Sequence, residues 1–128
     1  MDTADHKARV LIVDDDIDAL NSMSEILVAE GFDTVCAQDG QEAWLLMHQA
    51  PRPDLVVLDL MLPKMDGLTF RMHQRRDSSL AIIPVVIVTA FTSKVIDDDA
   101  EAVFAKPLNV PAFLKAVKSS ISRDRAAS

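Results

Sequence analysis

The sequence predicts an α/β domain in which helices cover both faces of a parallel sheet. Short runs of branched apolar residues alternate with longer stretches whose apolar residues recur at helical spacing. The short runs lack the apolar and polar alternation of a strand with one wet face, so we expect burial on both faces. Several runs end at a polar residue, which puts polar side chains at the carboxyl ends of the strands.

Five runs are predicted to be strands because each holds consecutive apolar residues, many of them β-branched. The fourth run is the strongest strand signal in the chain, and the fifth is short. From the N-terminus, the predicted strands are Val10–Val13, Thr34–Ala37, Leu55–Leu58, Ile82–Val88 and Val103–Ala105.

The stretches between these strands are predicted to be helices, since their apolar residues share one face. Gly31 suits the end of the first helix, and Asp39 with Gly40 turns the chain into the second. Prolines 51 and 53 end that second helix, and Asn109 caps the last one. The predicted helices span residues 17–31, 41–49, 67–76 and 110–121. Between Thr89 and Lys106 we expect at most a short fourth helix.

Composition favours one soluble domain. A chain of 128 residues can enclose one core, and no apolar run approaches the roughly 18 residues that span a bilayer. The polar start indicates no export signal, and Cys36, in an apolar stretch, is expected to pack as a reduced thiol in the cytoplasm. A formal charge of -7 disfavours direct binding of nucleic acid. We expect an N-terminal tail over 1–8, the domain over 9–122 and a C-terminal tail over 123–128.

The predicted strands deliver five polar residues to one edge of the sheet: Asp14, Asp15, Asp59, Thr89 and Lys106. Each also has a purely structural explanation, as a helix cap, a strand-end hydroxyl or a surface cation. Converging carboxylates repel each other unless a cation neutralises them, and carboxylates with waters are the usual ligands of Mg²⁺. The three histidines, His6, His48 and His73, are scattered and expected to be solvated, so zinc is not indicated.

This set of residues suits attack on phosphorus. A phosphoryl group in transfer spreads negative charge over its outer oxygens, so the protein needs only to position and neutralise it. Asp59 would be the nucleophile, while Mg²⁺ and Lys106 would neutralise the oxygens and Thr89 would donate a hydrogen bond to one of them.

Four sequence blocks resemble the receiver domains of two-component response regulators, chemotaxis regulators among them. The blocks occur in the family's order and at similar separations, over nearly the whole chain. They are Leu11–Asp16, Val57–Pro63 with Met65–Gly67, Val88–Ala90, and Lys106–Pro107.

The resemblance implies a flavodoxin-like, doubly wound sheet with strand order 2-1-3-4-5. It also implies that Asp59 accepts a phosphoryl group from the phosphohistidine of a histidine kinase or of a histidine phosphotransfer protein. Direct metal ligands would be Asp15, Asp59 and the carbonyl of Met61, with Asp14 acting through water. The metal would be Mg²⁺, or alternatively Mn²⁺. Thr89 and Lys106 would contact the phosphoryl oxygens, and the bond before Pro107 is expected to be cis.

Such a domain is not an enzyme with a separate substrate, because it catalyses its own phosphorylation and dephosphorylation. Its output is a changed protein-binding surface for a downstream protein that the sequence does not identify. Neither nucleic acid nor membrane is an expected direct partner.

Two departures from the family pattern concern signalling. Val103 occupies the place where the family usually carries a switch aromatic coupled to Thr89, and Phe104 is one residue late, on the opposite face of the strand. The segment from Thr89 to Lys106 is also shorter than usual by more than one helical turn, roughly 3.6 residues.

Three further positions flank the phosphoryl group in the family. Small Ala90 would leave room for it, while the bulk of Met61 and Phe91 should hinder an attacking water. We therefore expect a comparatively long-lived phosphoryl-aspartate.

Two alternatives stay open. The chain could be a receiver-like adaptor that does not use phosphorylation. Val103 and the short fourth segment favour this interpretation a little, whereas the intact Asp15, Asp59, Thr89 and Lys106 argue against it. It could also be a haloacid-dehalogenase-like phosphohydrolase, since residues 14–16 match that family's Asp-x-Asp spacing. The Gly-Thr expected next and a cap domain are both lacking.

Overall fold

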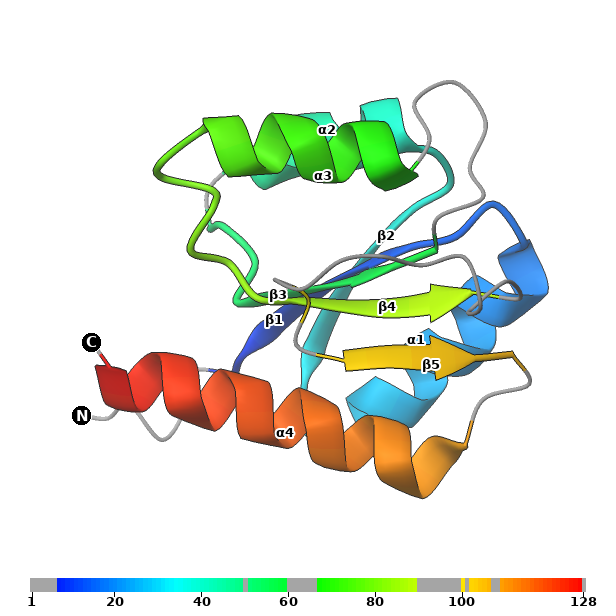
Figure 1. Ribbon diagram of the computed structural model, residues 1–128. Coiled ribbons are helices and arrows are strands. Elements are labelled where there is room, and N and C mark those ends of the chain that lie inside the picture. The colour runs from blue at the N-terminus through cyan, green and yellow to red at the C-terminus, as the bar shows by residue number, and fades with distance from the viewer. Residues whose placement is uncertain are drawn as a thin grey trace.

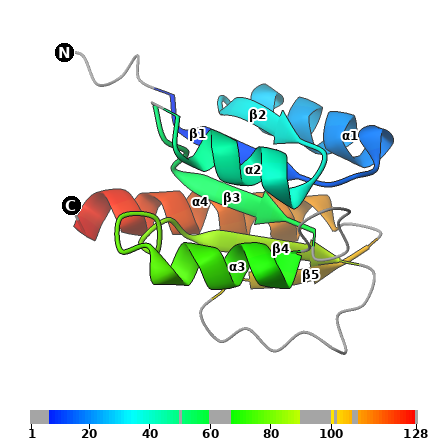
Figure 2. The ribbon, with the colours of Figure 1, turned by 90° about the horizontal axis from the view of Figure 1, so that it is seen from above.

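Five parallel strands form the centre of the structure, a computed structural model that describes residues 7–49, 51–59, 67–89, 100, 102–106 and 109–127. The strand order is β2-β1-β3-β4-β5, which confirms the predicted doubly wound sheet (Figure 2). The strands are β1 (Arg9–Val13), β2 (Asp33–Ala37), β3 (Leu55–Leu58), β4 (Val85–Thr89) and β5 (Ala102–Ala105). The helices are α1 (Ile17–Ala29), α2 (Gly40–Met47), α3 (Gly67–Arg76) and α4 (Val110–Ala127).

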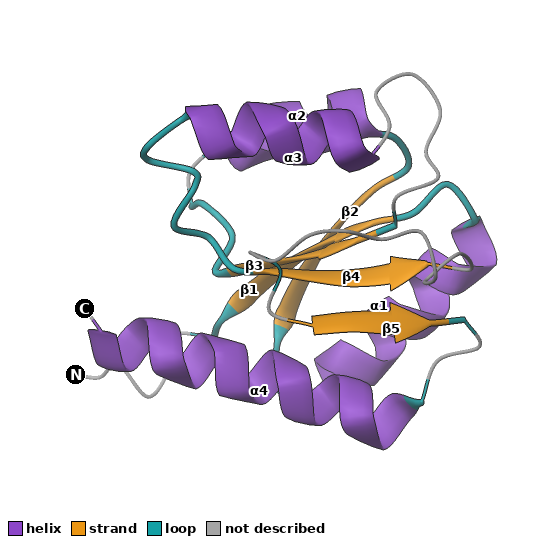
Figure 3. Cartoon of the chain, viewed as in Figure 1, coloured by secondary structure: helices purple, strands orange, loops and turns teal. Residues whose placement is uncertain are grey.

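Helices cover both faces of the sheet. Helices α2 and α3 lie above it in the view of Figure 1, and α1 and α4 lie below, as the colouring of Figure 3 also shows. Alternate residues of β1 supply the two cores: Val10 and Ile12 pack towards α1 and α4, whereas Leu11 and Val13 pack towards α2 and α3. This two-sided burial explains the continuous apolar runs of the central strands.

Capping residues set the helix boundaries, as the sequence predicts for Gly31 and Asn109. Asp16 accepts hydrogen bonds from the N–H groups of Asp18 (3.0 Å) and Ala19 (3.4 Å) at the start of α1. Gly31 follows α1 with a φ of 93°, a left-handed conformation that glycine adopts without strain. The side chain of Asn109 accepts the N–H of Ala112 (3.1 Å) at the start of α4.

Three local predictions differ from the structure. Strand β4 begins at Val85 rather than at Ile82, which is 73% exposed in the preceding turn. Helix α4 continues past residue 122 to Ala127, so the predicted polar tail is helical up to that point. Cys36 is exposed rather than packed, because β2 is an edge strand whose outer residues have fewer neighbours.

The predicted short fourth helix falls on residues 90–101, of which the structure describes only Ala100. Across the described ranges, no helix lies between β4 and β5, and the fourth helix is the C-terminal α4. None of the helices in the described part of the chain has both the length and the apolar character needed to cross a membrane.

A buried glutamine explains the late start of β4. Gln74, fully buried in α3, donates through Nε2 to the carbonyl oxygens of Leu80 (3.0 Å) and Ile83 (2.9 Å). Its Oε1 accepts a hydrogen bond from Arg71 Nη1 at 2.9 Å. These bonds hold residues 77–83 as turns, so the apolar residue at position 82 is not in the sheet.

Replacing Gln74 with leucine should lower the free energy of unfolding by about 2–4 kcal/mol, because two buried carbonyl groups lose their donor. Urea denaturation measures this loss. Gln41→Leu, at an exposed position of α2, is the matched control and should change stability by less than about 0.5 kcal/mol. Equal stability of the two variants would contradict the role given to Gln74.

Candidate functional site

The register of the sheet places Asp14 and Asp59 side by side. Val13 of β1 pairs with Leu58 of β3. Asp14 directly follows Val13, and Asp59 directly follows Leu58. Backbone hydrogen bonds extend this pairing: the Asp59 N–H donates to Val13 O (2.9 Å), and the Asp14 N–H donates to Ala37 O (3.1 Å). Neighbouring parallel strands therefore deliver both carboxylates to the same edge of the sheet.

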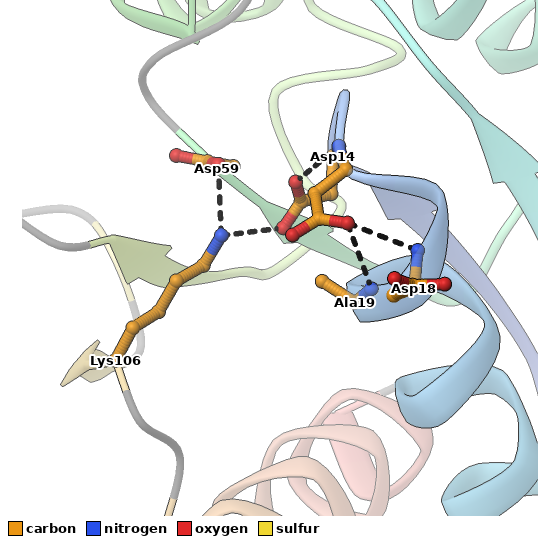
Figure 4. A network of polar contacts seen from close by, with 6 residues as sticks. Asp14, Asp18, Ala19, Asp59 and Lys106 are labelled. Carbon is orange, nitrogen blue, oxygen red and sulfur yellow. Dashed lines mark hydrogen bonds and ion pairs between the residues drawn. The ribbon is translucent and has the colours of Figure 1, made fainter.

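Lys106 joins the two carboxylates. Its Nζ donates to Asp14 Oδ2 at 2.7 Å and to Asp59 Oδ2 at 3.1 Å (Figure 4). Asp14 is fully buried and Asp59 is 6% exposed, so the ammonium group compensates charges that water reaches poorly. The backbone N–H of Lys106 donates to Thr89 O at 3.1 Å, which attaches the end of β5 to the end of β4.

Asp14, Asp15 and Asp59 form an acidic cluster in which the three carboxylate ligand atoms lie within 4.8 Å of one another. Three carboxylates at this spacing suit a hard divalent cation, and Mg²⁺ typically takes one or two carboxylates and keeps several waters. The donor set therefore fits the metal predicted from the sequence. Asp15 is exposed, whereas the buried Asp14 has both oxygens engaged, one by Lys106 and one by the N–H of Asp16 at 2.9 Å.

The charge of Lys106 depends on these contacts. Burial lowers the pKa of Lys106, but the hydrogen bonds and charges of Asp14 and Asp59 outweigh this effect and raise it above its ordinary value. A pKa raised by folding stabilises the folded state at pH values below the unfolded pKa. That contribution is lost as the pH rises through the folded pKa.

We expect the stability of the metal-free protein to fall above about pH 10.5, with a smaller fall in Lys106→Met. The chain contains no tyrosine, so ionisation of a phenol does not contribute to the change of stability with pH in this range. Urea denaturation of both proteins between about pH 9.5 and 11.5 measures the difference. If the free energy of unfolding fell equally steeply with pH in the wild type and in Lys106→Met, Lys106 would gain no stabilising charge interaction on folding.

Thr89 ends β4 and is 1% exposed, beside Ala105 in the neighbouring strand. Val103 is 39% exposed, and Phe104 points to the opposite face of the strand. There the ring of Phe104 packs edge-on against that of Phe113, with a centroid distance of 6.1 Å and an interplanar angle of 82°. Phe104 therefore belongs to the core on the α4 side and does not replace an aromatic at position 103.

Several predicted features lie outside the described residues: Met61, Ala90, Phe91 and the bond before Pro107. The structure brings together Asp14, Asp15, Asp59 and Lys106 from segments that are far apart in sequence.

The sequence did not reveal two features. One is that Asp16 helps to orient Asp14, because the Asp16 N–H donates a hydrogen bond to an Asp14 carboxylate oxygen. The other is that His48 and His73 are not scattered: both rings lie against Trp44, with centroid distances of 4.7 and 5.6 Å. His73 is also half-buried rather than fully solvated, because α2 and α3 pack together.

Comparison with known proteins identifies the family of the chain. The family model for the response regulator receiver domain matches residues 10–118, most of the chain. The chain belongs to this family. Receiver domains of two-component systems interact with histidine kinases and downstream targets, and they typically bind Mg²⁺ at an acidic pocket.

Individual relatives agree with the assignment. The receiver is 34% identical over 115 residues to the polar-differentiation response regulator DivK of Brucella anthropi, covering 86% of this chain and 93% of that protein. Among solved structures, it resembles a putative response regulator of Chloroflexus aurantiacus (TM-score 0.83, 26% identity, 91% and 98% of the two chains). It also resembles the chemotaxis protein CheY4 of Vibrio cholerae (TM-score 0.76, 26% identity, 89% and 98%).

Proposed function

We propose that this receiver accepts a phosphoryl group on Asp59 from the phosphohistidine of a histidine kinase or a histidine phosphotransfer protein. The observation that carries the proposal is the position of Lys106 Nζ between Asp14 and Asp59, beside the acidic cluster. The added charge would then change a protein-binding surface for a downstream protein. This makes the chain a signalling domain that catalyses its own phosphorylation and dephosphorylation.

The transfer exchanges one bond to phosphorus for another. A carboxylate oxygen of Asp59 attacks phosphorus as the bond to the histidine nitrogen breaks, and that nitrogen keeps the bonding electrons and takes a proton from water. Lys106 Nζ already lies 3.1 Å from Asp59 Oδ2. Its ammonium group would therefore be close enough to stabilise the negative charge that the phosphoryl oxygens carry during transfer. The Thr89 hydroxyl, at the end of the adjacent strand, would donate a hydrogen bond to one of these oxygens.

Asp15, Asp59 and the Met61 carbonyl would hold Mg²⁺ directly, or Mn²⁺ in its place. A bound cation would neutralise the phosphoryl oxygens and the carboxylates during transfer. Asp14 would act through water, because its two oxygens already accept hydrogen bonds from Lys106 and from the Asp16 N–H. The exposed Asp15 can turn towards a cation at a lower cost.

Further proposals follow from the same assignment. Ala90 would leave room for the phosphoryl group, and Met61 with Phe91 would slow hydrolysis by keeping water away. Thr89 would act as a switch without an aromatic partner, since the side chain at position 103 is valine. We place the protein in the cytoplasm, with neither nucleic acid nor membrane as a direct partner.

Incubation with a small phosphoramidate tests the proposal. Intact-mass spectrometry should show the mass of one added phosphoryl group in the presence of Mg²⁺, and none when EDTA replaces the metal. A non-phosphorylated adaptor would gain no mass under either condition. A phosphohydrolase would instead turn over a phosphate ester continuously, which we do not expect from a member of this family.

A further inference from the structure

Helices α2 and α3 lie side by side on one face of the sheet, and aromatic rings join them (Figure 2). The Trp44 ring of α2 lies edge-on to Phe70 of α3 at a centroid distance of 6.1 Å, and beside His73 at 5.6 Å. Phe70 is fully buried in the core on this side of the sheet, whereas Trp44 and His73 are half-buried. Packing therefore fixes the outer surface of the two helices before any partner binds, which lowers the entropy cost of binding.

Two apolar side chains project from this outer surface. Leu45 directly follows Trp44 and is 61% exposed, and Met72 directly precedes His73 and is 43% exposed. Successive residues of a helix point about 100° apart, so each of these side chains lies on the outward side of a residue that joins the helices. Methionine and aromatic residues are enriched where proteins bind one another, so this group of side chains suits the apolar part of a partner.

Arg76 places a cation beside these apolar groups. It is exposed and follows Met72 by four residues, so the two side chains lie on the same side of α3, one turn apart. Among the residues that the structure describes, no carboxylate forms an ion pair with Arg76. The side chain is therefore available to a carboxylate of a partner.

The charge of α3 is opposite to that of the whole chain. This helix contains three arginines and no acidic residue, although the formal charge of the chain is -7. Asp77, which directly follows α3, is engaged locally: its Oδ1 accepts the N–H (3.0 Å) and the hydroxyl (2.7 Å) of Ser79, and its Oδ2 lies 3.9 Å from His48 Nε2. The surface therefore favours an acidic partner, whereas the negative charge elsewhere opposes a long polyanion such as nucleic acid.

We propose that the α2–α3 surface, formed by Trp44, Leu45, Met72, His73 and Arg76, binds an acidic peptide segment of a partner protein. Aliphatic side chains of the peptide contact Leu45 and Met72 over the two rings, and a carboxylate of the peptide pairs with Arg76. The surface contains no member of the acidic cluster, so binding here needs no phosphoryl group on the protein.

Titration of the unphosphorylated full chain with a short blocked peptide, in which pairs of leucine alternate with pairs of glutamate, tests the proposal. Trp44 is the only tryptophan of the chain, so its fluorescence reports binding at this surface. We expect a saturable change of emission, and at least about tenfold weaker binding of the same peptide with lysine in place of glutamate. No saturable change, or equal binding of the two peptides, would overturn the proposal.

Two further ligands separate the apolar contacts from the charge. The acidic peptide with serine in place of leucine should bind at least about tenfold more weakly, because it buries less apolar area. Single-stranded DNA of the same length should also bind more weakly than the acidic peptide, because the chain as a whole is negative. Equal binding of the serine peptide, or tighter binding of the DNA, would contradict an acidic and aliphatic partner.

Matched variants locate the peptide on the α2–α3 surface. Arg76→Gln should weaken binding about two- to fivefold, the cost of one exposed ion pair, whereas Lys115→Gln, at an exposed position of α4 on the other face of the sheet, should not. Leu45→Ser should weaken binding about tenfold, whereas Val28→Ser, at an exposed position of α1, should leave it unchanged. The substituted side chains are all exposed, so these variants should fold like the wild type. Wild-type affinity in Arg76→Gln or in Leu45→Ser would refute the proposed surface.

Discussion

Asp59→Asn should remove covalent phosphorylation by phosphoramidate and Mg²⁺ altogether. Asparagine keeps the size of the side chain and one acceptor oxygen for Lys106, but it lacks the carboxylate oxygen that attacks phosphorus. Intact-mass spectrometry over the time in which the wild type is fully modified should show no added phosphoryl group. The fold should be retained, because the substitution removes one of three mutually repelling carboxylates.

Asp33→Asn is the matched control for this prediction. Asp33 lies in β2 and contacts Arg9 at the other edge of the sheet, so its substitution should leave phosphorylation unchanged. Full modification of Asp59→Asn would refute the assignment of the acceptor. Loss of modification in both variants would instead indicate a general effect of removing negative charge.

Lys106→Met should slow phosphorylation by roughly 10²–10³-fold, the usual cost of removing one donor to a developing oxyanion. Without metal it should also lower the free energy of unfolding by about 2 kcal/mol, because Asp14 and Asp59 lose their shared cation. This loss is smaller than the ~3–5 kcal/mol expected on breaking a fully buried ion pair, because the Lys106 side chain is 28% exposed. Saturating Mg²⁺ should restore part of it by neutralising the same carboxylates.

Lys118→Met separates this effect from the loss of any ion pair. Lys118 pairs with Glu30 between α4 and α1, and both side chains are substantially exposed, so the substitution should cost less than about 1 kcal/mol. Its phosphorylation rate should equal that of the wild type. A Lys106→Met protein with the wild-type rate would contradict the role of Lys106.

The central part of the fold was predictable because of two-sided burial. Leu55–Leu58 is apolar at every position since β3 packs on both faces, and the structure begins and ends this strand as predicted. The same rule failed at Ile82, where hydrogen bonds from Gln74 hold an apolar residue in an exposed turn. It also failed at Cys36, because an edge strand has a neighbour on one side only.

That the strand ends bring Asp14, Asp59 and Lys106 together was predictable from the sequence, but the contacts among them were not. Strand ends identify Asp14, Asp59 and Lys106, whereas the double hydrogen bond of Lys106 depends on the spacing of β1, β3 and β5. The contacts of His48 and His73 with Trp44 likewise depend on how α2 packs against α3. The spacing of apolar residues along one helix does not show which side chains of another helix will lie against it.

The most direct test is to locate the phosphoryl group. Borohydride reduces an acyl phosphate to the alcohol, which converts a phosphorylated aspartate into homoserine that peptide mass spectrometry can identify. After treatment with phosphoramidate and Mg²⁺, we expect homoserine at position 59 and at no other aspartate. Homoserine at a different aspartate, or none in a protein that has gained phosphoryl mass, would contradict Asp59 as the acceptor.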